Sequence, residues 1–481
     1  MKFFTRGPVP RRNVSNSTGL CRHGYTQMLG AAALAMLGCA RIAAAVNIQG
    51  VYPVAADQPQ INALITDPAT GKVLTTSAAS GSVYDIQAFL DTGTSGILLS
   101  RETQQALGVA LATYNGSPVV FNDVAVGGLQ PYNVSTPYDV STAPFSINND
   151  VTIGGTPPPV SAYTNTVGPL QMEVSQTAAN SLVGPLDIMG TPVMQGKVTV
   201  LDIRPANSAN INNLGETKTY IYNPGTPYNP SALDTNPGIV PTAYQVKLSY
   251  ASFNQFTSTT PTGATSPEQA ANPFVGPNPL DQLSSNPPTD TTPPVTISYG
   301  SNTATGSFLL DTGAQSSFIS KAVAGNVDVK YAAGVNAAGN PYLINSITGA
   351  VIPNQFTETV LGAGGGAVTA AGFYLNSLSL KTVQGQSINY LGAPVLVQNV
   401  TVKNPTTGQS LTLNGDLGMN FFEPSTNTSL STGSASPYTF MTIDQPNGLL
   451  GLTLAAVPEP ATLMLLLFAA PVLLLRRRRV A

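Results

Sequence analysis

The chain has 481 residues, of which 42% are hydrophobic and only 9% are charged. This length suits two domains with cores of their own. The 45 glycines and 40 prolines favour strands and turns over a helical bundle.

Residues able to supply several kinds of catalysis are confined to the beginning of the chain. The only histidine, His23, and the only cysteines, Cys21 and Cys39, precede residue 46. The remainder therefore lacks the side chains for Ser-His-Asp or Cys-His catalysis, for His- or Cys-ligated zinc, and for disulfides. We expect no metal and no cofactor, and a chemistry built on carboxylates, hydroxyls, Lys, Arg or Tyr.

Residues 1–45 have the composition of a secretory signal. They hold six basic residues and no acidic one, an apolar run at 28–40, and three alanines at 43–45 that suit a cleavage site. An uncleaved N-terminal anchor and lipoprotein processing at Cys39 are the alternatives. Residues 46–475 then carry ten basic and 23 acidic residues, a net charge of −13, which disfavours a nucleic-acid partner.

The first predicted lobe covers residues 46–205. Its main motif is "AFLDTGTSGILLS" (88–100), in which an apolar strand leads into Asp91-Thr92-Gly93. About a hundred residues later, Ile188-Met189-Gly190 precedes the alternating strand "KVTVLDI", which closes the lobe. A carboxylate that ends a buried strand is costly to desolvate unless something uses it.

A stretch rich in Pro, Asn and Thr follows at 206–294, and we expect parts of it to be a flexible linker. Within it, the apolar piece 242–253 is predicted to be a strand of either lobe.

The second predicted lobe, 295–456, repeats the order of the first. "SFLLDTGAQSSFIS" (307–320) places Asp311 220 residues after Asp91, and Asp416-Leu417-Gly418 precedes the strand "YTFMTID". This is an internal repeat of about 150 residues. Asp416, like Asp187 and Asp202, is interpreted as a turn or strand-end residue.

The end of the chain, 457–481, reads as a membrane-directed tail. Val457-Pro458-Glu459-Pro460 is followed by mostly apolar residues 461–475 and by four arginines, which would stay on the cytoplasmic side of a transmembrane helix. The three parts in this order resemble the PEP-CTERM sorting signal of bacteria. That resemblance implies export and processing by an exosortase-type membrane enzyme.

Two Asp-Thr-Gly turns, one per lobe, predict a pair of carboxyls that meet about a two-fold axis. Two carboxyls that lie close together share one proton over a range of acidic pH. The ionised member can take a proton from water while the protonated member donates to the carbonyl that the water attacks.

On these motifs, residues 46–456 resemble the bilobal aspartic peptidases of the pepsin and retropepsin clan. The resemblance implies an all-β fold of two β-barrel lobes with a cleft between them, besides the C-terminal transmembrane helix. It makes Asp91 and Asp311 the catalytic dyad. Its implied supporting residues are the hydroxyls that lock the turns, the glycines beside the water and the hydroxyl on the outer oxygen of Asp91: Thr92, Thr312, Gly93, Gly313 and Thr94.

Two features depart from the family pattern. Ala314 cannot do for Asp311 what Thr94 does for Asp91. A flap tyrosine is not evident either: Tyr132 and Tyr138 are candidates, with a surface-loop tyrosine as the default interpretation.

The predicted function is that of an exported aspartic endopeptidase, monomeric, acting on polypeptides at the cell envelope or outer surface, or secreted. A non-catalytic extracellular matrix or adhesion protein on the same scaffold is the alternative. A third hypothesis keeps the chemistry and makes the linker the substrate of self-processing.

Overall fold

A computed structural model describes residues 45–76, 82–125, 128–176, 186–207, 216–252, 267–283, 290–362, 366–403, 410–427 and 431–455. The predicted signal up to residue 44 and the predicted tail 457–481 lie outside the described residues. Within those ranges, no helix combines the length and apolar character needed to cross a membrane.

The described residues are mostly β-strand, as predicted, with two large sheets of 15 and 10 strands. The α-helices within them are short: α2 (Arg101–Leu107) and α3 (Lys321–Asn326). Ser100 and Ser320 cap these helices with their side-chain oxygens, which satisfies otherwise orphaned backbone N–H groups.

The 10-stranded sheet holds the first Asp-Thr-Gly turn. Residues alternate between buried and half-buried along β5 (Ile86–Leu90), the strand that leads into Asp91. The strand order is β12 (Asn165–Leu170), β11 (Tyr138–Ala143), β3 (Gln60–Asp67), β5, β14 (Ile188–Met189), β6 (Ile97–Leu99), β13 (Glu173–Ser175), β10 (Gly128–Val134) and β9 (Val120–Ala125), with β4 (Lys72–Val73) on β3.

The second turn lies in the 15-stranded sheet. One part of its order runs β21 (Phe308–Leu310), β30 (Gly415–Leu417), β22 (Phe318–Ile319), β27 (Ser387–Val397), β26 (Ala367–Lys381), β19 (Val295–Tyr299) and β20 (Asn302–Gly306), with β1 (Val46–Ile48) on β27 and β25 (Phe356–Leu361) on β26.

Both halves repeat one three-strand arrangement around the turn. In the first, β14 lies between β5 and β6, parallel to β5 and antiparallel to β6. In the second, β30 lies between β21 and β22 with the same two orientations. The repeat read from the sequence is thus present in the strand pairing.

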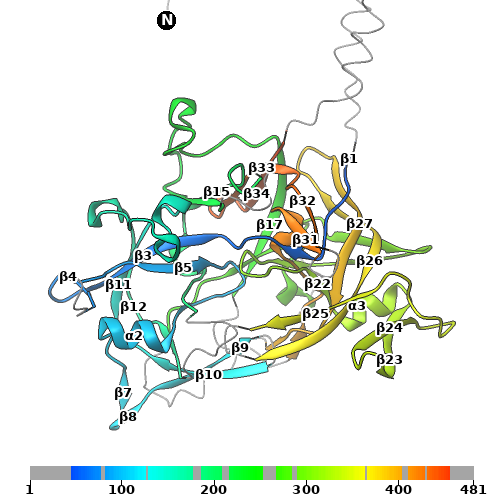
Figure 1. The fold of residues 1–481 in the computed structure, drawn as a ribbon, viewed down its shortest axis with the longest axis horizontal. Coiled ribbons are helices and arrows are strands. Elements are labelled where there is room, and N and C mark those ends of the chain that lie inside the picture. The colour runs from blue at the N-terminus through cyan, green and yellow to red at the C-terminus, as the bar shows by residue number, and fades with distance from the viewer. Residues whose placement is uncertain are drawn as a thin grey trace, which may run out of the picture. The chain divides into compact units, whose positions relative to one another are not determined.

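The other part of the 15-stranded sheet contains strands from both halves of the chain. β15 (Val198–Asp202) and β33 (Tyr438–Asp444), the alternating strands expected to close separate lobes, pair with each other antiparallel (Figure 1). The sheet continues with β16 (Lys218–Tyr222), β34 (Leu449–Leu454), β17 (Tyr244–Ala251) and β18 (Asn272–Val275). Three of these strands come from 206–294, and β17 is the strand predicted at 242–253.

One three-stranded sheet and three strand pairs complete the described fold. The three-stranded sheet consists of β2 (Val54–Ala55), β31 (Ser425–Asn427) and β32 (Thr432–Ser434). The pairs are β23 (Val329–Val335) with β24 (Pro341–Asn345), β28 (Thr401–Lys403) with β29 (Ser410–Thr412), and β7 (Thr113–Tyr114) with β8 (Ser117–Pro118).

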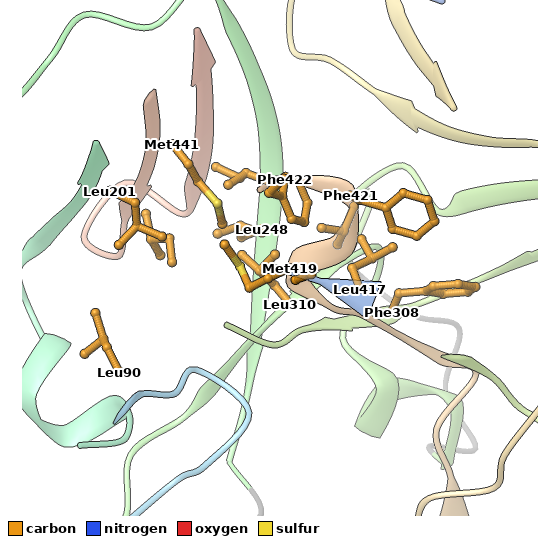
Figure 2. Packing of buried hydrophobic residues seen from close by; sticks show 14 of the residues in the cluster. Leu90, Leu201, Leu248, Phe308, Leu310, Leu417, Met419, Phe421, Phe422 and Met441 are labelled. Carbon is orange, nitrogen blue, oxygen red and sulfur yellow. The ribbon is translucent and has the colours of Figure 1, made fainter. Parts of the chain in front are cut away.

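The main core surrounds the strands that carry the turns. Leu310 and Leu417 pair in register, and both are fully buried with Met419 beside them (Figure 2). Burial of one such side chain stabilises the fold by about 1.5–3 kcal/mol. The strands that deliver Asp91 and Asp311 are therefore fixed by packing.

Candidate active site

Each predicted Asp-Thr-Gly turn begins where a buried strand ends. Asp91 follows β5 and donates its backbone N–H to Met189 O at 3.1 Å; Asp311 follows β21 and donates to Leu417 O at 3.1 Å. The crossing strand of each half thus holds the aspartate backbone.

The two threonines lock the turns to each other. Thr92 N donates to Thr312 Oγ1 and Thr312 N to Thr92 Oγ1, both at 3.0 Å. Each hydroxyl also donates to a carbonyl across the interface, to Leu310 O from Thr92 and to Leu90 O from Thr312. Both side chains are buried, so these bonds are shielded from competing water.

The Asp91 carboxyl accepts three hydrogen bonds from its own turn. Gly93 N and Thr94 N donate to Oδ1 at 2.7 and 3.1 Å, and Thr94 Oγ1 donates to Oδ2 at 2.6 Å. Such bonds to a carboxylate are charge-assisted, and three of them fix its orientation. The structure thus brings Thr94 to the outer oxygen of Asp91, as the resemblance implied.

The Asp311 carboxyl has a different environment. Gly313 N and Ala314 N donate to its Oδ1 at 2.8 and 3.1 Å, and the carboxyls of Asp91 and Asp416 are the charged groups that act on it. Burial, and after it repulsion from the Asp91 charge, holds the pKa of Asp311 well above the ordinary aspartate value.

Each carboxyl lies directly against the glycine of the opposite turn. A Cβ atom added at Gly93 would lie 2.4 Å from Asp311 Oδ2, and one at Gly313 would lie 2.4 Å from Asp91 Cγ. No side chain fits at either position. The two carboxyls that the sequence placed 220 residues apart therefore meet in one site.

Gly190 and Gly418 explain the repeated glycine of the crossing segments. A Cβ at Gly190 would lie 2.1 Å from Gly96 O, and one at Gly418 would lie 2.8 Å from Ala314 O. The chain behind each turn passes too close for any larger residue.

Each turn is also clamped by a segment that leads into the other half. Ala55 N donates to Gln315 O at 2.8 Å, and the Gln58 side-chain amide donates to Gly313 O. The mirror contacts are Ala270 N to Ser95 O at 2.8 Å and Asn272 Nδ2 to Gly93 O at 3.0 Å.

Sequence reasoning missed Gln58 and Asn272. A signal exists, because both clamps read Ala-Ala and then an amide residue before proline, at 55–59 and 270–273. The second copy lies in the stretch interpreted as a linker, where such a short repeat has no weight of its own.

The tyrosine candidates are both buried rather than on a surface loop. Tyr132 packs with Leu98 and Ile188 beside the first turn. Tyr138 belongs to the main core, where its hydroxyl accepts a hydrogen bond from Ala110 N at 2.9 Å. Neither candidate is thus on a surface loop.

The three other aspartates considered in the sequence analysis have different roles in the structure. Asp187 accepts bonds from Ser100 N and Thr103 Oγ1, and Asp202 pairs with Arg204 at 2.8 Å, which are structural roles. The strand-end interpretation does not hold for Asp416, which lies in the middle of β30 with its side chain buried and acts electrostatically on Asp311.

This geometry allows acid–base chemistry at one shared point. Asp91 is 9% exposed, and Asp311 retains partial exposure, so solvent reaches the pair. Two adjacent carboxyls can hold a proton between them and can give and accept protons in turn.

No protein-family model matches the chain, and no curated protein matches it. Among solved structures, the crystal structure of edgp is similar at a TM-score of 0.31 and 10% sequence identity, over 82% of this chain and 95% of that chain.

Proposed function

We propose that the chain is an aspartic-type endopeptidase that hydrolyses peptide bonds with a water activated between Asp91 and Asp311. The observation that carries this proposal is the pair of interlocked Asp-Thr-Gly turns, in which each carboxyl lies against the glycine of the opposite turn. Chance recurrence of a tripeptide gives no reason for two reciprocal bonds between Thr92 and Thr312 and a matching pair from their hydroxyls to Leu310 O and Leu90 O.

The two aspartates take unequal roles. Asp91, with three donors on its carboxylate, accepts the proton of the attacking water. Asp311, whose pKa is raised, keeps a proton and donates it to the carbonyl oxygen of the substrate. No cofactor is part of this mechanism.

The wider setting rests on the sequence. The proposed architecture is that of the pepsin and retropepsin clan, with two lobes and a substrate cleft. The chain would be exported, anchored for a time through 461–475, and released or retained at the cell envelope after processing by an exosortase-type enzyme. It would act as a monomer on polypeptides.

A non-catalytic matrix or adhesion protein is the second candidate. The low charge content of 9% and the Thr- and Asn-rich segments favour it. A binding scaffold has no need of the Thr94 hydroxyl on Asp91 or of a shared proton, and this favours the enzyme.

The test is hydrolysis of unfolded casein between about pH 3 and pH 7, with and without pepstatin. We expect activity in the wild-type chain, inhibition by pepstatin, and loss in Asp91→Asn. Asp67→Asn is the matched control, since the Asp67 side chain lies at the end of β3, away from the site, and bonds only within its own turn. Hydrolysis that persists in Asp91→Asn would overturn the proposal.

Self-processing is a narrower form of the same chemistry. Mass spectrometry of the purified chain would then find a cut within 206–294 that Asp311→Asn abolishes. An uncut wild-type chain that still hydrolyses casein would exclude this form alone.

A further inference from the structure

The backbone clamp on each turn is the same in the two halves. Ser95 O accepts from Ala270 N at 2.8 Å, and at the matching position of the second turn Gln315 O accepts from Ala55 N at 2.8 Å. Because these donors are backbone N–H groups, either clamp can form with different side chains. The side chains of the two clamps do differ, and the difference is confined to a few positions.

In the first half, a chain of side-chain hydrogen bonds is added to the clamp. Ser95 Oγ donates to Gln269 Oε1 at 2.5 Å, and Gln269 Nε2 donates to Glu173 Oε1 at 2.7 Å. Gln269 directly precedes Ala270, and Glu173 is the first residue of β13. The chain therefore runs from the first turn, through the clamp, to a strand of the sheet. We call these three residues, Ser95, Gln269 and Glu173, the Ser95 network.

Gly96 leaves room for this network. A Cβ atom added at Gly96 would lie 2.7 Å from Gln269 Nε2 and 2.7 Å from Glu173 Oε1. Any larger residue would therefore push the two polar groups aside and break the bond between them. The second turn has Ser316 at the matching position. The glycine is thus required by the network and not by the turn itself.

Strand register identifies the counterpart of Glu173 in the second half. Glu173 on β13 pairs with Leu98 of β6, and Leu396 on β27 pairs with Phe318 of β22, both in parallel. Leu98 and Phe318 are themselves equivalent, because each pairs antiparallel with the crossing strand of its half. A leucine thus occupies, in the second half, the position that holds a carboxyl in the first.

Gln269 has an apolar counterpart as well. Val54 precedes Ala55 in the second clamp, as Gln269 precedes Ala270 in the first. Glu173 is 2% exposed, and a buried carboxyl costs free energy unless it is bonded, whereas an apolar side chain of similar volume does not. Since the second half holds its turn with apolar residues at both positions, fold stability does not account for the network.

The network also has a fixed direction. Glu173 Oε1 accepts, so the amide nitrogen of Gln269 faces it and the amide oxygen faces Ser95. The Ser95 hydroxyl must then donate, and its orientation is fixed. Ser95 directly follows Thr94, whose hydroxyl donates to Asp91 Oδ2 at 2.6 Å.

We propose that Gln269, oriented by Glu173, is a positioning residue of the active site that fixes the first turn at Ser95. The network thereby also holds the neighbouring hydroxyl of Thr94 on the Asp91 carboxyl. The inference rests on the proposed function. It gives an additional constraint to the half that accepts the proton of water, which suits a group that must meet that water in a fixed geometry.

The first test replaces the network by its counterpart from the second half. Gln269→Val and Glu173→Leu each lower kcat on casein by about 10-fold and leave KM within about 2-fold, because substrate still binds while Asp91 is less well aligned. The double variant loses no more than either single variant, since each change already breaks the same chain of bonds. Losses that multiply in the double variant would contradict the inference.

The second test separates hydrogen bonding from packing. Burial, and after it the charge of Asp123, holds the pKa of Glu173 well above the ordinary glutamate value, so its carboxyl is neutral at acidic pH. Glu173→Gln keeps an acceptor oxygen at that place and retains most of the wild-type kcat, whereas Glu173→Leu does not. Ser95→Ala, which removes only a hydroxyl, serves if the leucine variant fails to fold, and it should show the same 10-fold loss as the valine variant, to about a factor of two. Equal kcat in wild type and Ser95→Ala would contradict the inference.

Asp91→Asn distinguishes failure of this inference from failure of the proposed function. If Asp91→Asn is inactive while Gln269→Val has the kcat of the wild type, Gln269 has no positioning role and the proposed function stands. If Asp91→Asn retains activity, the proposed function itself fails, and the inference fails with it.

Discussion

Two groups of buried carboxyls lie in this molecule, and they are satisfied in different ways. The first is the candidate site. The second, which we call the Glu423 cluster, consists of Asp57, Asp150, Glu216 and Glu423, brought together from four separate segments.

Fixed donors distinguish the first group. Asp91 and Asp311 each accept two backbone N–H bonds from their own turns. Donors that are part of a rigid turn stabilise negative charge without any rearrangement, which is the condition for acid–base chemistry.

In the Glu423 cluster, Thr217 links two of the carboxyls. Thr217 donates from N to Asp57 Oδ2 at 2.9 Å and from Oγ1 to Glu423 Oε1 at 2.8 Å. Oε2 of both Glu216 and Glu423 is buried without a hydrogen-bond partner. The ion pairs found in the described ranges join Arg204 to Asp202 and Asp234, so none of them neutralises this cluster.

Burial raises pKa values in both groups, and Asp311 is the example in the candidate site. Burial and a hydrogen bond with Asp150 raise the pKa of Glu216 to about 8, and burial holds that of Glu423 well above its usual range. The fixed donors thus equip the candidate site for proton transfer. The carboxyls of the Glu423 cluster are instead stabilised by protonation, so the fold is more stable at acidic pH.

The largest expected effect is on catalysis, where substitutions in the candidate site and in the Glu423 cluster should differ most. Asp311→Asn lowers kcat on casein by about 10³-fold or more, since the proton donor of the dyad is lost. Glu423→Gln leaves kcat near the wild-type value, because an amide replaces a carboxyl that is already neutral. Equal losses in the two variants would show that the groups do not have separate roles.

Thr312→Val removes one side of the cross-turn lock and costs about 3 kcal/mol of unfolding free energy, since two buried bonds lose their partner. Urea unfolding followed by fluorescence measures it. Thr401→Val, at an exposed position whose hydroxyl pairs only with Thr412, is the control and changes stability by less than about 0.5 kcal/mol. A similar loss in both variants would contradict the role of the lock.

The Glu423 cluster predicts a stability that falls as pH rises. A carboxyl whose pKa is raised by folding stabilises the protein fully below its unfolded value, and the contribution is lost as pH passes the folded value. For Glu216 that window runs from the usual 4.5 to about 8. Its partial exposure limits the loss to about 1 kcal/mol.

Thermal unfolding at several pH values measures this loss. Glu216→Gln, which cannot ionise, should flatten the decline across that window, while Asp67→Asn should not. A wild-type protein more stable at pH 8 than at pH 5 would mean that the cluster is relieved by something other than protonation.

The internal repeat, the all-β character and the meeting of the two Asp-Thr-Gly turns could be predicted because each depends on a short local sequence pattern. An apolar strand precedes Asp-Thr-Gly twice, and the closing strands show alternating apolar and polar residues. The pairing of β15 with β33 could not, since period-2 patterns give a buried face and not a partner.

Long-range partners account for the other gaps. Gln58 reaches Gly313 across 255 positions, and Asn272 lies in a stretch whose Pro and Asn content indicates a linker. Asp416 was misinterpreted because its environment is set by the register of β30 against β21 and β22, which the sequence does not specify.

The smallest expected effects set two single donors against each other. Thr217→Val keeps the backbone bond to Asp57 and removes the hydroxyl bond to Glu423, for about 1 kcal/mol of stability and no change in kcat. Asn272→Ala removes the bonds to Thr92 O and Gly93 O at a similar cost in stability. It should also lower kcat several-fold, because it loosens the turn that holds Asp91. Each variant is the control for the other, with urea unfolding and casein hydrolysis measured on both. If Thr217→Val lowered kcat as much as Asn272→Ala, the effect would be one of general stability, and the clamp on the first turn would lose its separate meaning.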